Sequence, residues 1–298
     1  MKKMDIINGP KQVPVIIQGF MQAPDLSIDE IVKVIENTYE LGVTFYDHAT
    51  CYTHWEAEQR FGDAFRKTSI KREDVIIQSK CGHLKNMFDW SKESILESVD
   101  GSLKRLQTDY LDVLLLHHRD VIFEPEEVAD AFDQLYTSGK VRYFGVSNVP
   151  LLQIELLKKY VKQPLVFTQH QLLFELSVIE KAPAEMFVSR NTGLLDYCRL
   201  NDITIQTWSP LLFGFFKGSF IDPDFPELNK VLAELGDKNG VSKTAVEIAW
   251  LLRHPAKMQV ILGTTNPSHL KDACDACKVS LTRQEWYQIY HEAAKYLP

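Results

Sequence analysis

Short apolar runs alternate with stretches of helical periodicity along most of this chain. The run at 13–19 is rich in Val and Ile and ends at Gly19, which predicts a strand. Ser27 and Glu30 then have the spacing of a capping box, and apolar residues three and four positions apart follow until Gly42. The alternation continues, with strands predicted at 13–19, 43–46, 74–80, 111–117, 141–146, 165–169, 203–208 and 258–262, and further helices at 56–67, 91–106, 126–138, 150–160, 192–201, 242–253 and 267–276.

Alternating strands and helices favour parallel strands with the helices packed outside them. Eight such units are the number found in a (β/α)8 TIM barrel, an α/β fold in which active groups lie on the loops after the strands. We therefore predict one barrel domain over residues 1–298. The loops at 170–191 and 209–228 exceed the usual connection length, which suggests functional or lid-like segments. The aromatic cluster at 213–220 suits either a lid or a separate hydrophobic cluster.

Groups capable of proton chemistry lie at the ends of three predicted strands. Asp47, Lys80 and His117 each follow or end a strand, and Tyr52 lies in the loop beyond Asp47. Because parallel barrel strands end at one rim, we expect these four side chains to converge.

A phenol with an ordinary pKa of about 10 is a weak acid near neutral pH. An adjacent ammonium group, such as that of Lys80, is expected to lower the pKa of Tyr52 by stabilising the phenolate. A carboxylate can keep the lysine charged and oriented, and an imidazole N–H can contact the oxygen that receives the proton. The set suits protonation of a carbonyl oxygen while its carbon accepts hydride.

Composition and charge narrow the class of partner. The chain has 40 acidic and 33 basic side chains and a net charge of −7, so it has no general attraction for nucleic acid or an anionic membrane. It lacks a signal-like apolar run and a run of about 20 apolar residues, which suggests a cytoplasmic protein. The five scattered cysteines indicate reduced thiols. A small molecule is the expected partner, and the oligomeric state is not predicted.

The ordered set of motifs resembles the aldo-keto reductases over nearly the whole chain. The matching residues run from Gly42 through the four groups above and onward, and they include Glu58, Gly62, Gly145, Ser147, Asn148, Gln169, Trp208 to Leu211 and Ile261 to Pro267. The resemblance implies reduction of an aldehyde or ketone by a nicotinamide nucleotide. Tyr52 is then the general acid, Lys80 lowers its pKa, Asp47 holds Lys80 and His117 orients the carbonyl.

Neither a G-x-G-x-x-G motif after a strand nor a P-loop motif is present, so hydride chemistry needs another nucleotide site. The resemblance implies that Ser147, Asn148 and Gln169 hold the nicotinamide carboxamide and that Trp208 stacks on its ring. It implies that the rest of the nucleotide lies over the two segments after the last strands, and the expected cofactor-binding residues are Gly19, Phe20, Asp47, Ser147, Asn148, Gln169, Trp208, Ser209, Pro210, Leu211, Phe213, Gly263, Thr264, Thr265 and His269.

The segment after the last strand bears on the choice of nucleotide. Gly263 stands where a lysine is found in many NADP-binding relatives, and His269 stands where an arginine is common. Thr264, Thr265 and the histidine can still hydrogen-bond a phosphate. We therefore expect NADP as the cofactor, with NAD also acceptable.

Other departures from the family pattern concern the pocket wall and hence the substrate. Thr53 replaces a frequent glycine, and His118, Arg119 and Asp120 replace a proline-containing turn.

Two other functions stay open at this point. Asp47 with His48, His54, His118 and His170 could suggest a metal-dependent barrel hydrolase, although no H-x-H or H-E-x-x-H motif frames a site, so we predict no metal site. A nucleotide-binding regulatory subunit without catalysis is the other alternative.

Overall fold

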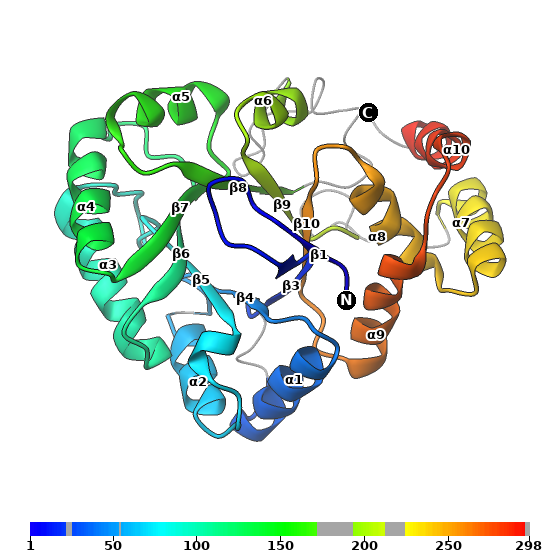
Figure 1. Ribbon diagram of the computed structural model, residues 1–298, viewed down its shortest axis with the longest axis horizontal. Helices are drawn as coiled ribbons and strands as arrows, with labels where there is room; N and C mark the ends of the chain where they lie inside the picture. The colour runs from blue at the N-terminus through cyan, green and yellow to red at the C-terminus, as the bar shows by residue number, and fades with distance from the viewer. Residues whose placement is uncertain (22–25, 54, 172–192, 212–223, 296–298) are drawn as a thin grey trace.

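The computed structural model describes residues 1–21, 26–53, 55–171, 193–211 and 224–295. Within them, eight parallel strands form a closed barrel in the order β10-β3-β4-β5-β6-β7-β8-β9, with helices around the outside (Figure 1). The predicted (β/α)8 barrel is therefore confirmed. The barrel strands are β3 (Ile16–Gly19), β4 (Phe45–Asp47), β5 (Ile76–Cys81), β6 (Leu111–His117), β7 (Val141–Ser147), β8 (Leu165–Gln171), β9 (Thr204–Trp208) and β10 (Gln259–Leu262).

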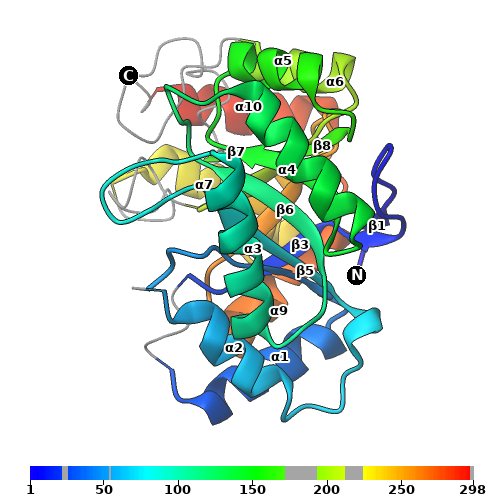
Figure 2. The same ribbon diagram turned by 90° about the vertical axis from the view of Figure 1, so that its left-hand side faces the viewer.

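The predicted helices are all present, with ends that differ by one or two residues in most cases. They are α1 (Ile28–Glu40), α2 (Ala57–Phe65), α3 (Lys92–Leu106), α4 (Pro125–Thr137), α5 (Leu151–Tyr160), α6 (Leu194–Leu200), α8 (Lys243–Arg253) and α9 (Pro267–Asp275). The described residues also contain two short 3-10 helices, η2 (Arg72–Asp74) and η4 (Ala276–Lys278). The capping box at the start of α1 is formed as expected, by Ser27 and Glu30. In Figure 2, α3 and α4 lie in front of the strands that they cover.

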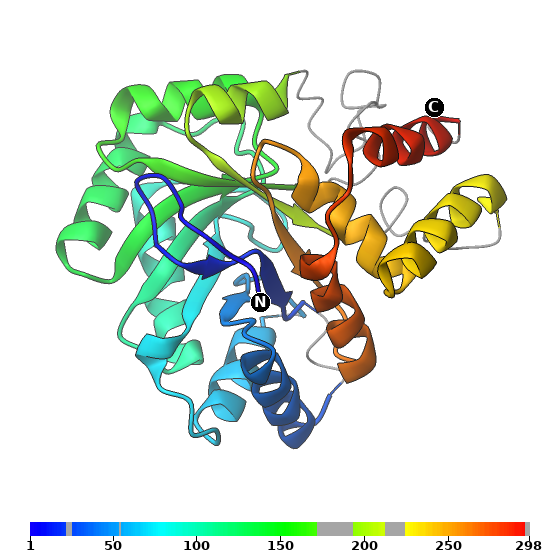
Figure 3. The ribbon, with the colours of Figure 1, turned by 45° about the vertical axis from the view of Figure 1, so that its right-hand side comes forward.

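Two helices were not predicted from the sequence. They are α7 (Pro226–Asn239) and α10 (Arg283–Ala294), which pack against each other beside α8 (Figure 3). Lys238 of α7 forms an ion pair with Glu285 of α10 at 2.6 Å. The sequence did contain a signal for α10, because Thr282 and Glu285 form a capping box at its start.

A small hairpin closes the amino-terminal end of the barrel. Strands β1 (Lys3–Met4) and β2 (Val13–Pro14) pair antiparallel, so the predicted strand at 13–19 is in fact split between β2 and β3. Ile6, between β1 and β2, is fully buried against an apolar cluster that includes Phe45 and Phe167. This cluster fills the amino-terminal end of the barrel with apolar side chains. The polar candidate groups lie at the opposite, carboxyl end. No helix in the described part of the chain is long and apolar enough to cross a bilayer.

Candidate active site

Strand alternation brings the candidate groups into the barrel interior. Phe45 belongs to the apolar interior cluster, and Asp47 lies two residues further along β4, so its side chain faces the same interior. Asp47 is paired in register with Gln78 of β5, and Lys80 follows Gln78 by two residues. His117 is the last residue of the neighbouring strand, β6. Three strands therefore deliver their final polar side chains to one rim.

Lys80 is the centre of this group. Its ammonium nitrogen donates to Asp47 Oδ2 at 2.7 Å, to Tyr52 Oη at 2.9 Å and to the main-chain oxygen of His48 at 2.8 Å. An ammonium has three N–H donors, so each has an acceptor. Because Lys80 is 0% exposed, these contacts replace the water that a free lysine would bind. The convergence of Asp47, Lys80 and Tyr52 is as the sequence predicted.

A network of buried glutamines supports Asp47 from the other side. Gln78 Nε2 donates to Asp47 Oδ1 at 2.6 Å, and Gln169 Nε2 donates to the same oxygen at 3.0 Å. Both amides also donate to Gln206 Oε1, at 2.9 and 3.2 Å, and Gln206 Nε2 donates to Gln259. The sequence analysis missed this network, since each glutamine lies on a different strand with nothing to link them in sequence. The amides fix the carboxylate that holds Lys80.

The electrostatics of Tyr52 differ from the expectation. Burial raises the pKa of the Tyr52 phenol to about 12, although Lys80 opposes this rise, and Asp47 adds to it. The predicted net lowering of that pKa was therefore wrong. Burial alone would lower the pKa of Lys80, but Asp47 and then Tyr52 outweigh it and raise this pKa. Near neutral pH the pair is a neutral phenol beside an ammonium.

His117 completes the predicted set of four. Its ring is edge-on to that of Tyr52, with centroids 5.9 Å apart and an interplanar angle of 87°. Burial, followed by the neighbouring His118 and then Lys80 and His83, holds the pKa of His117 well below its usual value. The imidazole is therefore neutral at pH 7 and offers a single N–H.

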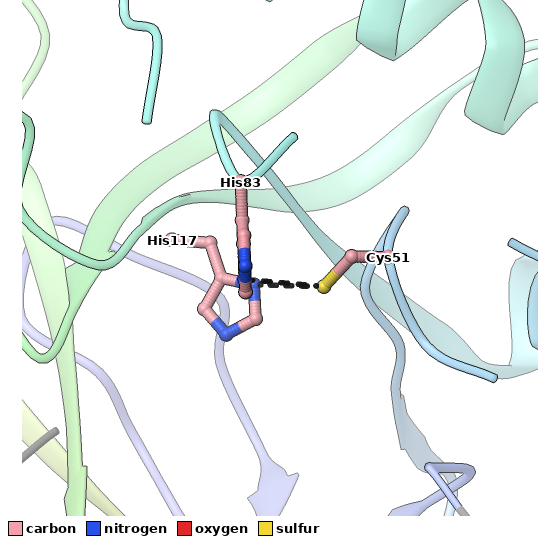
Figure 4. A group of neighbouring side chains, drawn as sticks. All are labelled: Cys51, His83 and His117. Carbon is pink, nitrogen blue, oxygen red and sulfur yellow. Dashed lines mark hydrogen bonds between the residues drawn. The ribbon is translucent and has the colours of Figure 1, made fainter. Parts of the chain in front are cut away.

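Cys51, next to Tyr52, had no chemical role assigned from the sequence, and His83 was not considered there, but the structure places both beside His117. Cys51 Sγ lies 3.5 Å from His83 Nδ1 and 3.6 Å from His117 Nδ1, and both imidazoles point toward the sulfur (Figure 4). Cys51 directly precedes Tyr52, and His83 follows β5 after Gly82. Gly82 has φ of +88°, and a Cβ there would meet Trp90 at 2.5 Å, so this turn needs glycine.

A cavity of about 600 Å³ opens beside these groups. On one side, Trp208 Nε1 donates to Asn148 Oδ1 at 3.1 Å, and Asn148 Nδ2 donates to Ser147 Oγ at 3.2 Å. The indole plane is therefore held by a hydrogen bond. The predicted site residues that line the cavity are Gly19, Asp47, Tyr52, His117, Ser147, Asn148, Gln169, Trp208, Ser209, Pro210, Leu211, Gly263 and Thr264.

Three further predicted cofactor residues, Phe20, Thr265 and His269, are not part of the cavity lining. The ring of Phe20 is 1% exposed and packs against His48 and Phe61, so its side chain belongs to the core. Thr265 and the exposed His269 lie at the start of α9, next to the cavity wall formed by Gly263 and Thr264. Phe213 and the aromatic segment 213–220 lie outside the described residues, as does most of the loop at 170–191.

Gly19 and Gly263 differ in the space that is available for a side chain. A Cβ on Gly19 would approach Ile261 Cγ2 at 3.1 Å and the main-chain oxygen of Leu262 at 3.2 Å, so close packing against β10 explains this residue. At Gly263 an added Cβ would meet nothing within 4 Å. Open space at that position leaves the cavity wall accessible to a ligand.

The three described histidines of the hydrolase alternative, His48, His118 and His170, have other neighbours than Asp47. The ring of His48 packs against Phe20 and Phe61, with centroids 5.2 and 4.4 Å apart, and burial lowers its pKa to about 3. His170 Nε2 forms a hydrogen bond of 2.8 Å with Thr168 Oγ1. His118 Nδ1 lies 3.5 Å from Asn148 Nδ2, and His54 lies outside the described residues. Both oxygens of Asp47 are bonded to the lysine and the glutamines.

Comparison with known proteins agrees with this arrangement. The model of the aldo/keto reductase family matches residues 15–292, which is nearly the whole chain. The chain belongs to the aldo/keto reductase family. The resemblance inferred from its motifs is thereby confirmed.

Among curated relatives, this aldo/keto reductase is similar to the uncharacterized oxidoreductase YcsN of Bacillus subtilis, with 34% identity over 88% of this chain and 87% of the relative. It is 32% identical to a 6-dehydroglucose reductase of Agrobacterium fabrum over 89% of this chain and 88% of that protein. A probable voltage-gated potassium channel subunit beta of Arabidopsis thaliana is 27% identical over 85% of this chain and 84% of that protein.

Solved structures share the fold. The thermostable aldo-keto reductase Tm1743, in complex with the inhibitor epalrestat, superposes with a TM-score of 0.81 at 24% identity, covering 98% of this chain and 100% of that one. An aldo/keto reductase from Klebsiella pneumoniae in complex with NADP and acetate gives a TM-score of 0.77 at 24% identity over 96% and 94% of the two chains.

Proposed function

We propose that this aldo/keto reductase uses NADPH to reduce the carbonyl group of an aldehyde or ketone to an alcohol. The observation that carries the proposal is the hydrogen-bonded chain Asp47–Lys80–Tyr52, which ends on the wall of a cavity large enough for a ligand. Membership of an oxidoreductase family supports the same reaction class. The cytoplasmic location and the single-domain organisation expected from the sequence stay part of the proposal.

Tyr52 is the proposed general acid. Its phenol is protonated near neutral pH, and it is still a stronger acid than the alcohol that forms. As the proton leaves Oη, the Lys80 ammonium at 2.9 Å stabilises the phenolate that remains. Asp47 and its glutamine partners hold Lys80 charged and in position. His117 has one neutral imidazole N–H, which can donate to the carbonyl oxygen and orient it.

The cavity offers groups that fit a nicotinamide nucleotide. Ser147, Asn148 and Gln169 bring hydroxyl and amide groups to one wall, which are the partners that a carboxamide requires. Trp208 brings an aromatic ring to the same cavity, and its N–H donates to Asn148, which fixes the plane of a ring of the kind that stacks on a flat ligand. When bound, the nucleotide would supply the hydride for the carbonyl carbon.

The preference for NADPH is a finer part of the proposal. Thr264 lines the cavity, and Thr265 and His269 lie just before and within the first turn of α9, where the positive end of the helix dipole favours an anion. The Klebsiella relative of known structure holds NADP, which supports the same choice. With Gly263 in place of a basic residue, we expect NADH to be used as well, with a higher KM.

The decisive experiment follows the absorbance of NADPH in the presence of the purified chain and a panel of aldehydes, ketones and diones, with NADH in parallel. Consumption of NADPH that depends on both protein and carbonyl supports the proposal. Tight binding of the nucleotide with no turnover on any carbonyl would instead favour a regulatory subunit. The similarity to a potassium channel subunit beta is the observation that keeps this second function under test.

A further inference from the structure

Among the residues that the structure describes, Cys51, His83 and His117 bring one sulfur and two imidazoles together, with ligand atoms all within 4.8 Å of one another. We call these three residues the cysteine–histidine group. Its members follow three neighbouring strands, since Cys51 lies after β4, His83 after β5 and His117 at the end of β6. All three line the cavity. The proposed reduction uses only His117, so the thiol and the second imidazole have no part in it.

The spacing of the group fits a tetrahedral metal ion. Zinc lies about 2.3 Å from a cysteine sulfur and about 2.0–2.1 Å from an imidazole nitrogen. At a tetrahedral angle these bond lengths place sulfur and nitrogen about 3.5 Å apart. The observed distances from Cys51 Sγ are 3.5 Å to His83 Nδ1 and 3.6 Å to His117 Nδ1. Both sulfur-to-nitrogen distances are thus those of a shared cation, and the two nitrogens lie within 4.8 Å of each other.

The type of ligand also selects the ion. A thiol and two imidazoles are soft or borderline ligands, which suit zinc, cobalt or copper better than magnesium or calcium. Three protein ligands leave the fourth position open, and in this group that position is available to water or another small molecule in the cavity. The hydrolase set considered from the sequence was centred on Asp47 and contained neither Cys51 nor His83.

We propose that the cysteine–histidine group binds one Zn²⁺ ion or a similar thiophilic divalent cation. Binding forms one bond from the Cys51 sulfur, whose proton is released to solvent, and one bond from the Nδ1 lone pair of each imidazole. Each imidazole keeps its single proton on Nε2, and no electron is transferred. His117 therefore still has an N–H to offer after the cation has bound. The site does not depend on the proposed reductase activity.

A different explanation of the same distances is hydrogen bonding alone. A thiol has one hydrogen, so Cys51 can donate to only one imidazole and must accept from the other. Such an arrangement would hold the side chains at similar separations without affinity for a cation. The experiment has to separate these two cases.

The test is titration of the nucleotide-free full chain with Co²⁺ alone, followed by absorption spectroscopy. We expect one Co²⁺ per chain, with the near-ultraviolet thiolate-to-cobalt band and visible bands of a tetrahedral site. Zn²⁺ should displace Co²⁺ and abolish these bands, since zinc binds such ligands more tightly. Failure of Co²⁺ to bind would overturn the proposal and leave hydrogen bonding as the role of the group.

Two variants identify the ligands, and a third serves as the control. Cys51→Ser should abolish the thiolate band, and His83→Gln, at a half-buried position, should weaken Co²⁺ binding at least tenfold. Cys277→Ser removes a partly exposed thiol outside the cysteine–histidine group and should leave the spectrum unchanged. A band that survives Cys51→Ser, or that is lost in Cys277→Ser, would overturn the assignment, as would unchanged affinity in His83→Gln.

Discussion

The ammonium nitrogen of Lys80 lies 2.9 Å from the phenol oxygen of Tyr52, and the lysine is fully buried. The lysine does not make this phenol a strong acid, because burial raises the pKa of Tyr52 to about 12 despite Lys80. Its effect is instead on the phenolate, which would otherwise form in an apolar cavity without a counter-charge. The pair is suited to giving a proton at the moment when the carbonyl oxygen becomes basic.

Tyr52→Phe is expected to remove the proton donor while keeping the ring. General acid catalysis contributes about 10²–10⁴-fold to a rate, so kcat for carbonyl reduction should fall by that factor. The dissociation constant for NADPH, measured by fluorescence titration, should change less than twofold. The matched control is Tyr136→Phe, which removes a phenol at an exposed position of α4 and should leave both values unchanged. Substantial residual reduction in Tyr52→Phe would contradict the role assigned to the phenol.

Lys80→Met is expected to destabilise the protein strongly, since it leaves the Asp47 carboxylate buried without its cation. Loss of one partner of a buried pair costs about 3–5 kcal/mol of unfolding free energy. Adding Asp47→Asn should recover part of this loss, and urea denaturation of the single and double variants measures the coupling. Lys67→Met breaks an exposed pair with Asp29, at 2.9 Å, and should leave the free energy of unfolding nearly unchanged. Equal losses in the buried and exposed cases would contradict the structural argument.

The two reaction directions should differ in their dependence on pH. Reduction needs the protonated phenol, which persists below its pKa of about 12, so the rate of reduction should stay nearly constant between pH 6 and 9. Alcohol oxidation needs the phenolate and should rise with pH across the same range. The pKa of His117 is held well below its usual value by burial, so its protonation should not reduce the rate above pH 6. Profiles of kcat/KM in both directions check this, and a fall in reduction near pH 7 would be inconsistent with it.

Gln206→Leu tests the glutamine network. The change removes the oxygen that accepts from Gln78 and Gln169 and the N–H that Gln259 accepts, so buried polar atoms lose partners. The expected cost is about 1–3 kcal/mol of unfolding free energy, measured by urea denaturation. The control is Gln134→Leu, at an exposed position of α4, which should be within about 0.5 kcal/mol of the parent. A neutral Gln206→Leu would mean that the network adds little to stability.

Much of the barrel could be predicted because its signals are local. Apolar runs, capping residues and glycines recur with each unit, so the eight strands and most helices follow from short windows of sequence. Helices α7 and α10 were missed for different reasons. The first follows a long segment in which the alternation was interrupted, and the second comes after the eighth strand, where the barrel pattern predicted no more units. The Thr282–Glu285 capping box was nevertheless available as a signal.

The sequence by itself determined the fold and the positions of Asp47, Lys80 and His117 at strand ends, with Tyr52 in the loop after the first of them, since those depend on order along the chain. Only the tertiary structure decided which side chains share a hydrogen bond and how deeply each is buried. The glutamine network, the upward shift in the pKa of Tyr52 and the contact of Cys51 with two imidazoles all arise from register between strands and from loss of water. Neither strand register nor the burial of a side chain can be determined from a short stretch of sequence, because both depend on residues far apart in the chain.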